Sequence, residues 1–197
     1  MRFLIGVDEA GRGPLAGPVS VGVVAVPENF DVAMEFPGVN DSKKLTEKKR
    51  EEFYTMLTDR TAKGDIRFVV EFESAEMIDK DGIVPAVQRA LSRGLHALAP
   101  DTALTRVQLD GSLHAPKEYE QETIIGGDAL IPIISLASIA AKVERDRLMC
   151  ILAKEYPEYS FETHKGYGTK IHYEMLEKYG LCAIHRRSFV HLDKEDK

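Results

Sequence analysis

The stretch that decides the fold covers residues 2–26 and reads RFLIGVDEAGRGPLAGPVSVGVVAV. Residues 2–9 and 18–26 are short and rich in valine, a composition typical of β-strands. Between them, residues 10–17 concentrate glycine and proline, which favour a special turn over a helix. The stretch therefore predicts two neighbouring strands joined like a hairpin by an unusual loop.

Strands and helices alternate after this opening, which predicts an α/β domain with a mixed sheet. We expect strands over residues 67–72, 105–109 and 123–125, and helices over residues 42–62, 83–98 and 134–155. Asp41 or Ser42 is the predicted cap of the first helix. A length of 197 residues favours one domain, with residues 159–197 as a C-terminal helical extension packed on it.

Charge and cysteine content narrow the class of protein. With 26 lysines and arginines against 32 aspartates and glutamates, the net charge is −6, so bulk charge cannot hold a polyanion and a local basic patch is required. Cys150 and Cys182 are too few for a disulfide scaffold and are predicted to be buried thiols in a reducing compartment. Residues 3–7 are too short a run for a signal peptide, so we expect a cytoplasmic protein without membrane segments.

Four acidic residues stand at or just after predicted strand ends, where open α/β sheets collect their ligands. They are Asp8, Glu9, Asp110 and Asp128. Asp8 and Glu9 could share one site only if the strand breaks there, because adjacent strand residues point to opposite faces. Carboxylates alone favour Mg²⁺ or Mn²⁺ and phosphoryl transfer. The alternative is that the aspartates merely form turns.

The glycine-rich loop and two basic clusters suggest contacts with a polyanion. Residues 11–18 could expose backbone N–H groups to a phosphate or sugar, or could simply connect two strands. Residues 41–50 and 164–170, together with Arg186 and Arg187, carry the clustered positive charge. Such clusters are more often solvated faces than nucleic-acid contacts.

Several motifs taken together carry a family pattern. They read GVDEAGRGPLAGPV at residues 6–19, NDSKKL at 40–45, LDG at 109–111, ASIAAKVERD at 137–146, HKGY at 164–167 and HRRSF at 185–189. In this order they strongly resemble bacterial ribonuclease HII, the type 2 ribonuclease H. The resemblance implies a ribonuclease H-like fold with a five-stranded mixed sheet flanked by helices. It also implies hydrolysis of the RNA strand of RNA–DNA hybrids and cleavage 5′ of single ribonucleotides in duplex DNA, leaving 3′-hydroxyl and 5′-phosphate ends, in repair and replication.

The resemblance also assigns roles to individual residues. It places a catalytic site with two Mg²⁺ or Mn²⁺ ions on Asp8, Glu9, Asp110 and Asp128. Backbone contacts to the ribonucleotide 2′-hydroxyl fall on Gly11, Arg12 and Gly13, and stacking on the next deoxyribose falls on Tyr167. Phosphate contacts fall on Lys43, Lys44, Arg186 and Arg187. Asp146 lies four residues after Lys142 in a predicted helix, and we assign it to structure.

One position departs from the family pattern. Gly126 stands where the family commonly has lysine, which removes a positive charge near the fourth acid. Two rival functions are another nuclease on the same fold and a non-catalytic hybrid-binding module. The loop with Tyr167 disfavours the first, and the presence of all four acids disfavours the second. We expect a monomer that binds RNA–DNA hybrid and ribonucleotide-containing DNA, and the sequence indicates no protein partner.

Overall fold

The computed structural model describes residues 2–99 and 101–191. Five strands form one mixed sheet in the order β3-β2-β1-β4-β5. Their bounds are β1 Phe3–Ala10, β2 Val19–Pro27, β3 Arg67–Glu73, β4 Thr105–Asp110 and β5 Glu120–Ile124. Strand β2 runs antiparallel to both β1 and β3, whereas β4 lies parallel to β1 and β5 parallel to β4. The predicted mixed sheet and its opening pair of strands are confirmed.

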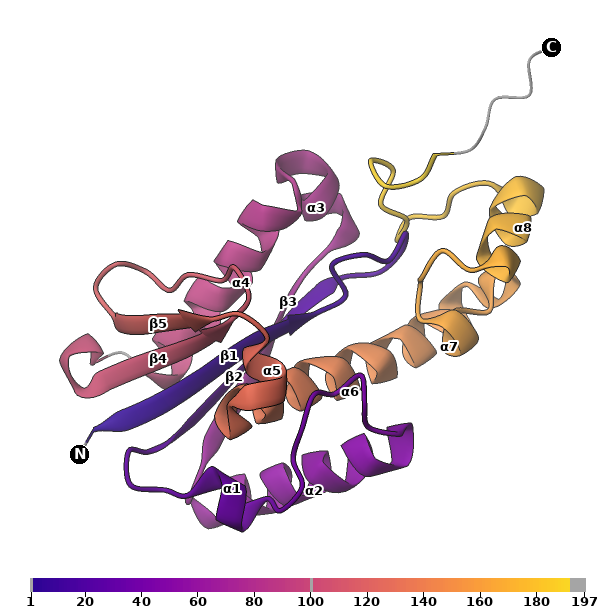
Figure 1. Ribbon diagram of the computed structural model, residues 1–197. Helices are drawn as coiled ribbons and strands as arrows, with labels where there is room; N and C mark the ends of the chain where they lie inside the picture. The colour runs from indigo at the N-terminus through magenta and orange to yellow at the C-terminus, as the bar shows by residue number, and fades with distance from the viewer. Residues whose placement is uncertain (1, 100, 192–197) are drawn as a thin grey trace.

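Helices cover both faces of this sheet (Figure 1). They are α1 Val32–Glu35, α2 Glu47–Lys63, α3 Ala75–Asp81, α4 Ile83–Leu98, α5 Gly127–Leu130, α6 Pro132–Glu155, α7 Phe161–His164 and α8 Lys170–Tyr179, with 3₁₀ turns η1 Thr102–Leu104 and η2 Pro157–Tyr159. The long α6 and α2 lie on one face, α4 lies on the other, and α7 and α8 gather at the end of α6. Within residues 2–99 and 101–191, no helix is both long and apolar enough to cross a membrane.

Two apolar cores lie on the two faces of the sheet. Val21 and Val23 pack with α4, whereas their neighbours Val24 and Val26 pack with α2 and α6, as expected from the alternation of a strand. Helix α6 approaches the sheet very closely, because a Cβ atom at Gly6 would overlap the backbone of α6. Glycine in β1 therefore brings the N-terminal half of α6 against the strand that carries Asp8.

Three element boundaries differ from the prediction. Helix α2 begins at Glu47, because Thr46 caps it by accepting a hydrogen bond from the Lys49 amide at 3.2 Å. Ser42 does not cap the helix as predicted, because it is buried and its hydroxyl lies 2.8 Å from that of Ser138. Strand β5 covers Glu120–Ile124 and begins earlier than predicted. The prediction missed its first residues because they are polar, as suits a strand at the sheet edge. Helix α6 begins earlier as well, at Pro132, a residue favoured at the first helical position.

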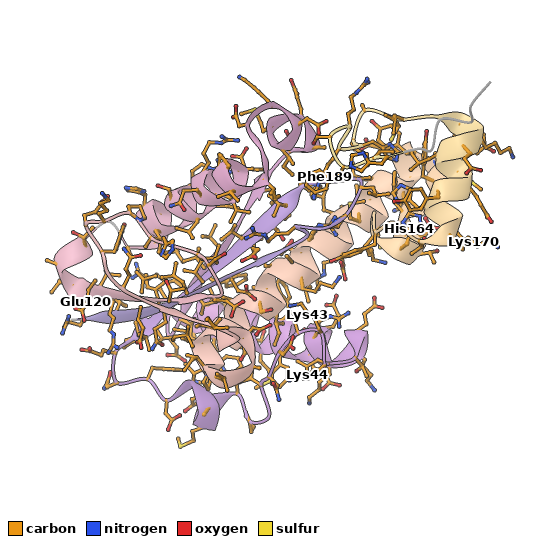
Figure 2. All side chains as sticks on the ribbon, turned by 45° about the horizontal axis from the view of Figure 1, so that its top comes forward. Lys43, Lys44, Glu120, His164, Lys170 and Phe189 are labelled. Carbon is orange, nitrogen blue, oxygen red and sulfur yellow. The ribbon has the colours of Figure 1, made fainter. Side chains whose placement is uncertain are left out.

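A third apolar cluster joins the C-terminal segment to the loop between β1 and β2. It contains Leu15, Met149, Tyr159, Phe161 and Leu176 among its buried members. The prediction that both cysteines are buried is wrong, because Cys150 and Cys182 are only half-buried. In Figure 2 the labelled His164, Lys170 and Phe189 lie in this part, at the opposite end of the molecule from Glu120.

Three histidines are also buried in or beside this third cluster. They are His164, His172 and His185. Burial lowers the pKa of each imidazole, and for His185, with the neighbouring His172 adding to the effect, it lowers the pKa to about 4. The folded protein therefore favours neutral imidazoles, while the unfolded chain takes up protons below about pH 6.5.

We expect the free energy of unfolding to fall as the pH drops from 6.5 towards 4. The contribution of a depressed histidine pKa is fully present above the unfolded value and is lost on acidification, which amounts to roughly 3 kcal/mol for His185. Urea unfolding at pH 7, 6 and 5 measures the free energy of unfolding of the native chain and of His185→Gln. The difference in this free energy between the two proteins should shrink with falling pH, and a constant difference would contradict a lowered pKa for His185.

Candidate active site

The register of the sheet brings two predicted acids together. Val7 of β1 lies opposite Leu109 of the parallel β4, so the next residues, Asp8 and Asp110, lie side by side where the pairing of these two strands ends. Asp128 arrives from the first turn of α5, and its amide donates to Asp110 Oδ1 at 3.3 Å. One carboxylate oxygen from each of Asp8, Asp110 and Asp128 lies within 4.8 Å of the others.

Glu9 stands beside this three-aspartate cluster and is not part of it. No strand break separates Asp8 from Glu9, because β1 stays paired with β2 through Ala10, yet Glu9 is near enough for its charge to raise the pKa of Asp8. Instead, Glu9 Oε1 accepts a hydrogen bond from Arg12 Nη1 at 3.3 Å. Its other oxygen, Oε2, is buried and has no hydrogen-bond partner among the described residues. An unpartnered buried carboxylate oxygen is unfavourable unless a ligand meets it.

The electrostatics of the cluster favour a bound cation. Burial, and then the charges of Glu9 and Asp110, raise the pKa of Asp8 well above its usual value. Burial and Asp110 also raise the pKa of Asp128, although the ammonium of Lys43 opposes this from 3.5 Å away. A set of crowded oxygen donors matches what Mg²⁺ and Mn²⁺ prefer. The residues present therefore fit a divalent metal.

The glycine-rich loop is held from inside by Arg186. Its guanidinium donates to three carbonyl oxygens, those of Gly11 at 2.7 Å, Arg12 at 2.9 Å and Gly17 at 2.9 Å. Because the side chain is fully buried, the prediction that Arg186 contacts phosphate is wrong. The adjacent pair of arginines in the sequence gave no sign that one member points inward.

Arg145 of α6 supports the far part of the same loop. This guanidinium is also fully buried and donates to the carbonyls of Ala16 at 3.2 Å, Pro18 at 2.9 Å and Lys165 at 3.0 Å. Within residues 2–99 and 101–191, no carboxylate forms an ion pair with either arginine. Two unpaired positive charges therefore lie under the loop, and the backbone carbonyls that they bind point inward.

A cavity of about 230 Å³ opens between this loop and Tyr167. Its lining residues are Glu9, Ala10, Gly11, Arg12, Gly13, Ser42, Lys43, Ser138, Lys142 and Tyr167. The Tyr167 ring is 41% exposed, and Lys142 Nζ and the Arg145 guanidinium lie 5.7 and 5.8 Å from its centroid. The predicted loop and the predicted ring thus face one cavity, next to the acidic cluster.

The remaining predicted basic residues are not in this cavity. Lys44 is exposed beside Lys43 in the segment before α2, and Figure 2 labels both. Arg187 is exposed on the far side of the loop, where its backbone amide donates to Asp79 of α3 at 2.8 Å. Gly126 has a left-handed backbone (φ 69°) that glycine adopts without strain, which suits glycine better than lysine.

Sequence reasoning missed two serines of the site. Ser42 and Ser138 share a hydrogen bond of 2.8 Å, and Ser138 also bonds the Asp8 carboxylate. Ser138 lies within the ASIAAKVERD motif of the family resemblance and in a run of small residues that lets α6 lie against β1, but neither pattern assigns it a role at the site. Ser42 was instead interpreted as a helix cap.

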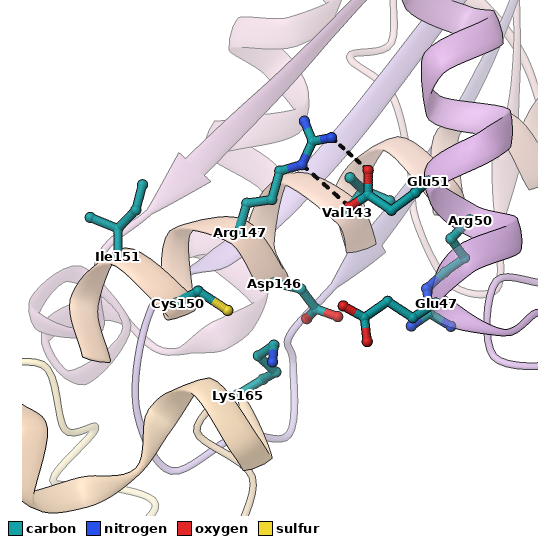
Figure 3. Close-up of a pocket in the computed structure, with 9 residues that line it drawn as sticks. All are labelled: Glu47, Arg50, Glu51, Val143, Asp146, Arg147, Cys150, Ile151 and Lys165. Carbon is teal, nitrogen blue, oxygen red and sulfur yellow. Dashed lines mark hydrogen bonds and ion pairs between the residues drawn. The ribbon is translucent and has the colours of Figure 1, made fainter. Parts of the chain in front are cut away.

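A separate cavity of about 230 Å³ lies between α2 and α6 (Figure 3). An ion pair of 2.6 Å between Arg147 of α6 and Glu51 of α2 lies at its wall. Asp146 also lines it and pairs with Lys142 at 2.8 Å, as predicted from their spacing. None of the three clustered aspartates borders this cavity, and the mixed charges of its lining do not favour an anion or a cation.

The strand order and the acids at the carboxyl edge define a protein of the ribonuclease H-like fold class. A family model described as Ribonuclease HII matches residues 5–192. The chain belongs to the ribonuclease HII family and is therefore a ribonuclease H, an endonuclease. It is 45% identical to ribonuclease HII of Endomicrobium trichonymphae over 93% of this chain and 83% of that protein.

Solved structures agree with the fold. Ribonuclease H2 from Pyrococcus horikoshii OT3 superimposes with a TM-score of 0.69 and 28% identity, covering 94% of this chain and 93% of that one. Bst-RNase HIII in complex with Mn²⁺ superimposes with a TM-score of 0.66 and 16% identity, covering 91% of this chain and 63% of that one. At such low identity the second comparison supports the fold alone.

We expect Asp8→Asn to stabilise the metal-free protein at pH 7.5. A carboxyl whose pKa is raised in the folded state lowers the stability as the pH rises above its unfolded-state pKa, and the loss is complete above its folded-state pKa. Asparagine removes the charge while keeping the oxygen that accepts from the Glu9 amide. Each 1 kcal/mol gained should raise the melting temperature by about 2–4 °C. Mn²⁺ should raise the melting temperature of the native chain in scanning calorimetry. In Asp8→Asn most of this rise should be lost.

The control is Asp146→Asn, which removes the ion pair between Lys142 and Asp146 within α6 but leaves the three-aspartate cluster intact. It should keep the full response to Mn²⁺. An Asp8→Asn protein that is less stable than the native chain and still responds fully to Mn²⁺ would exclude Asp8 from the metal site.

Proposed function

We propose that this ribonuclease H cuts on the 5′ side of single ribonucleotides embedded in duplex DNA, as well as within RNA–DNA hybrids, using Mg²⁺ or Mn²⁺. The observation that carries the proposal is the cavity in which the loop 11–13 faces Tyr167 beside three clustered aspartates. In this proposal one ribonucleotide and the sugar that follows it lie between these walls. The scissile phosphate would then lie at the acidic edge.

Asp8, Asp110 and Asp128 are the proposed metal ligands, and Glu9 is the fourth. The unpartnered Oε2 of Glu9 supports its inclusion, since a cation would satisfy that oxygen. When bound, such cations supply an activated water and neutralise the charge that develops on the phosphate. Asp8 and Asp110 would hold the cations at the carboxyl ends of β1 and β4, where the pairing of the two strands fixes the spacing of these side chains.

The loop 11–13 is the proposed reader of the ribonucleotide 2′-hydroxyl. Arg186 binds the carbonyls of Gly11 and Arg12 from the buried side, which fixes the backbone that faces the cavity. The 2′-hydroxyl is the group that distinguishes RNA from DNA at one nucleotide. A reader made of fixed backbone makes recognition local, so that one ribonucleotide is enough.

Tyr167 is the proposed stacking partner for the deoxyribose that follows the cut. Its ring is half exposed, and Lys142 and Arg145 lie near it, so its surroundings attract a phosphate backbone. Lys43 at the rim is the proposed phosphate contact, and Lys44 and Arg187 are outer ones. Arg12 is held by Glu9 and contributes its backbone to the loop.

Products with 3′-hydroxyl and 5′-phosphate ends would suit ribonucleotide removal in DNA repair and replication in the cytoplasm. We propose that the chain acts as a single catalytic domain, with residues 159–197 as its C-terminal extension. The shared packing of Leu15, Tyr159 and Leu176 supports this arrangement for the described part of that segment.

The test is cleavage mapping on end-labelled duplexes with Mn²⁺. A DNA duplex with one ribonucleotide should be cut only on its 5′ side, and an all-DNA duplex should resist cleavage at high enzyme concentration. Asp110→Asn should lower the rate by roughly a thousandfold or more, because it removes a charged ligand. Tyr167→Ala should slow cutting at the single ribonucleotide more than cutting within a continuous hybrid.

Circular dichroism of Asp110→Asn is the control that the variant remains folded. Cleavage on the 3′ side, a need for several consecutive ribonucleotides, or equal cutting of all-DNA duplex would each contradict the proposal. The last result would favour a different nuclease on the same fold.

Salt dependence tests the basic contacts separately. Binding to a ribonucleotide-containing duplex should weaken steeply with salt although the protein is acidic overall, because lysines release counterions from the phosphates. Replacing Lys43 and Lys44 together by alanine should make the log–log salt slope shallower by about one to two units. Lys48→Ala, an exposed lysine on α2, is the matched control and should leave the slope unchanged. An equal slope for the native chain, the double variant and Lys48→Ala would mean that Lys43 and Lys44 are solvated and do not contact phosphate.

A further inference from the structure

A chain of hydrogen bonds through two buried imidazoles ends at Tyr167. The amide of Cys182 lies 2.9 Å from Nδ1 of His185, and the two Nε2 atoms of His185 and His172 lie 3.1 Å apart. Nδ1 of His172 then lies 2.9 Å from the carbonyl oxygen of Tyr167. Both imidazoles are buried, so no water replaces these partners without a rearrangement.

The two ends of this chain determine the proton positions on both rings. A backbone amide only donates and a carbonyl only accepts, so His185 carries its proton on Nε2 and His172 carries its proton on Nδ1. His185 therefore donates to His172 across the 3.1 Å contact. Each ring must accept at one nitrogen and donate at the other, which a neutral imidazole does and a purely apolar side chain cannot.

A third imidazole holds the preceding residue in the same way. His164 donates through Nε2 to the Tyr159 carbonyl at 2.7 Å and accepts the Gly166 amide at Nδ1, at 3.2 Å. Its ring also stacks on His172, with centroids 4.4 Å apart. The backbone at Gly166 and Tyr167 is thus tied to buried side chains on both sides.

The Tyr167 side chain depends on this backbone support. Among the described residues its hydroxyl makes no hydrogen bond, and the cationic groups of Lys142 and Arg145 lie 5.7 and 5.8 Å from the ring centroid. The Tyr167 backbone, in contrast, donates to the His164 carbonyl at 2.9 Å, and its carbonyl also accepts from the Thr169 amide at 2.8 Å. The turn before it is unusual, since Lys165 has a left-handed backbone (φ 52°) that costs energy for a non-glycine residue. The position of the ring over the cavity is therefore set by what holds the Tyr167 backbone.

We propose that His172 and His185 are positioning residues that fix the Tyr167 ring over the cavity and thereby set the preference for a deoxyribose after the cut. This inference rests on the proposed role of Tyr167. Neither imidazole touches the cavity, so both act through the Tyr167 carbonyl. A displaced ring would contact the following sugar poorly and would lose the discrimination that depends on that contact.

The experiment compares kcat/KM on two substrates, a DNA duplex with one ribonucleotide and a continuous RNA–DNA hybrid. His172→Leu removes both hydrogen bonds with a side chain of similar size. It should lower kcat/KM on the single ribonucleotide about tenfold, the scale expected when a positioning group shifts, and change the hybrid far less. His172→Asn, whose amide can still donate to the Tyr167 carbonyl, should restore most of the ratio between the two substrates.

Two further proteins separate positioning from loss of stability. Leu176→Ala leaves a void one helical turn further along α8, in the same apolar cluster, without touching the imidazole chain. It should lower the melting temperature and leave the substrate ratio unchanged. In a Tyr167→Ala background, His172→Leu should have no further effect on the ratio, because the ring through which it acts is absent.

The outcomes separate this inference from the proposed function. If Tyr167→Ala changes the ratio and His172→Leu does not, the positioning role is wrong while the role of Tyr167 stands. If Leu176→Ala changes the ratio as much as His172→Leu, the imidazoles act only through stability and the inference is also wrong. If Tyr167→Ala itself leaves the ratio unchanged, the stacking role fails and the inference fails with it.

Discussion

Two guanidinium groups under the loop between β1 and β2 connect three distant parts of the chain. Arg145 comes from α6 and Arg186 from the C-terminal segment, and both end on backbone carbonyls of that loop. Burying such a charge is costly unless every donor finds an acceptor, and charge-assisted hydrogen bonds to carbonyls meet that requirement. The loop, the long helix and the C-terminal segment must therefore adopt their positions together, and the cavity beside Tyr167 depends on all three.

The acidic edge depends on a different constraint, the parallel pairing of β1 with β4. Parallel strands deliver their last residues to the same edge, which sets Asp8 beside Asp110 without any contribution from the loops. The cost is a cluster of carboxylates that burial and mutual repulsion make unfavourable when no cation is bound. Such a concentration of unfavourable charge is typical of sites whose stability is given up for function.

The sequence was sufficient for the mixed sheet with its opening pair of strands and for three of the acids, because short apolar strands followed by Asp8 and Asp110 are local patterns. It named Glu9 as a fourth ligand but did not show that Glu9 lies beside the three-aspartate cluster, because that position follows from the pairing of β1 through Ala10. Arg186 was misassigned because nothing in a basic dipeptide tells which side chain is buried, and burial depends on a loop far away in the sequence. The start of β5 was missed for a related reason, since an edge strand can be polar throughout.

The contact between Arg186 and Gly11 joins residues separated by 175 positions. During synthesis β1 and its loop are made first, and the guanidinium of Arg186 follows 175 residues after Gly11. Closing so long a loop has an entropic cost, and this cost is offset only when the distant contact forms. The nascent chain can thus build much of its sheet early, while the loop beside Tyr167 gains its buried support only after Arg186 has been made.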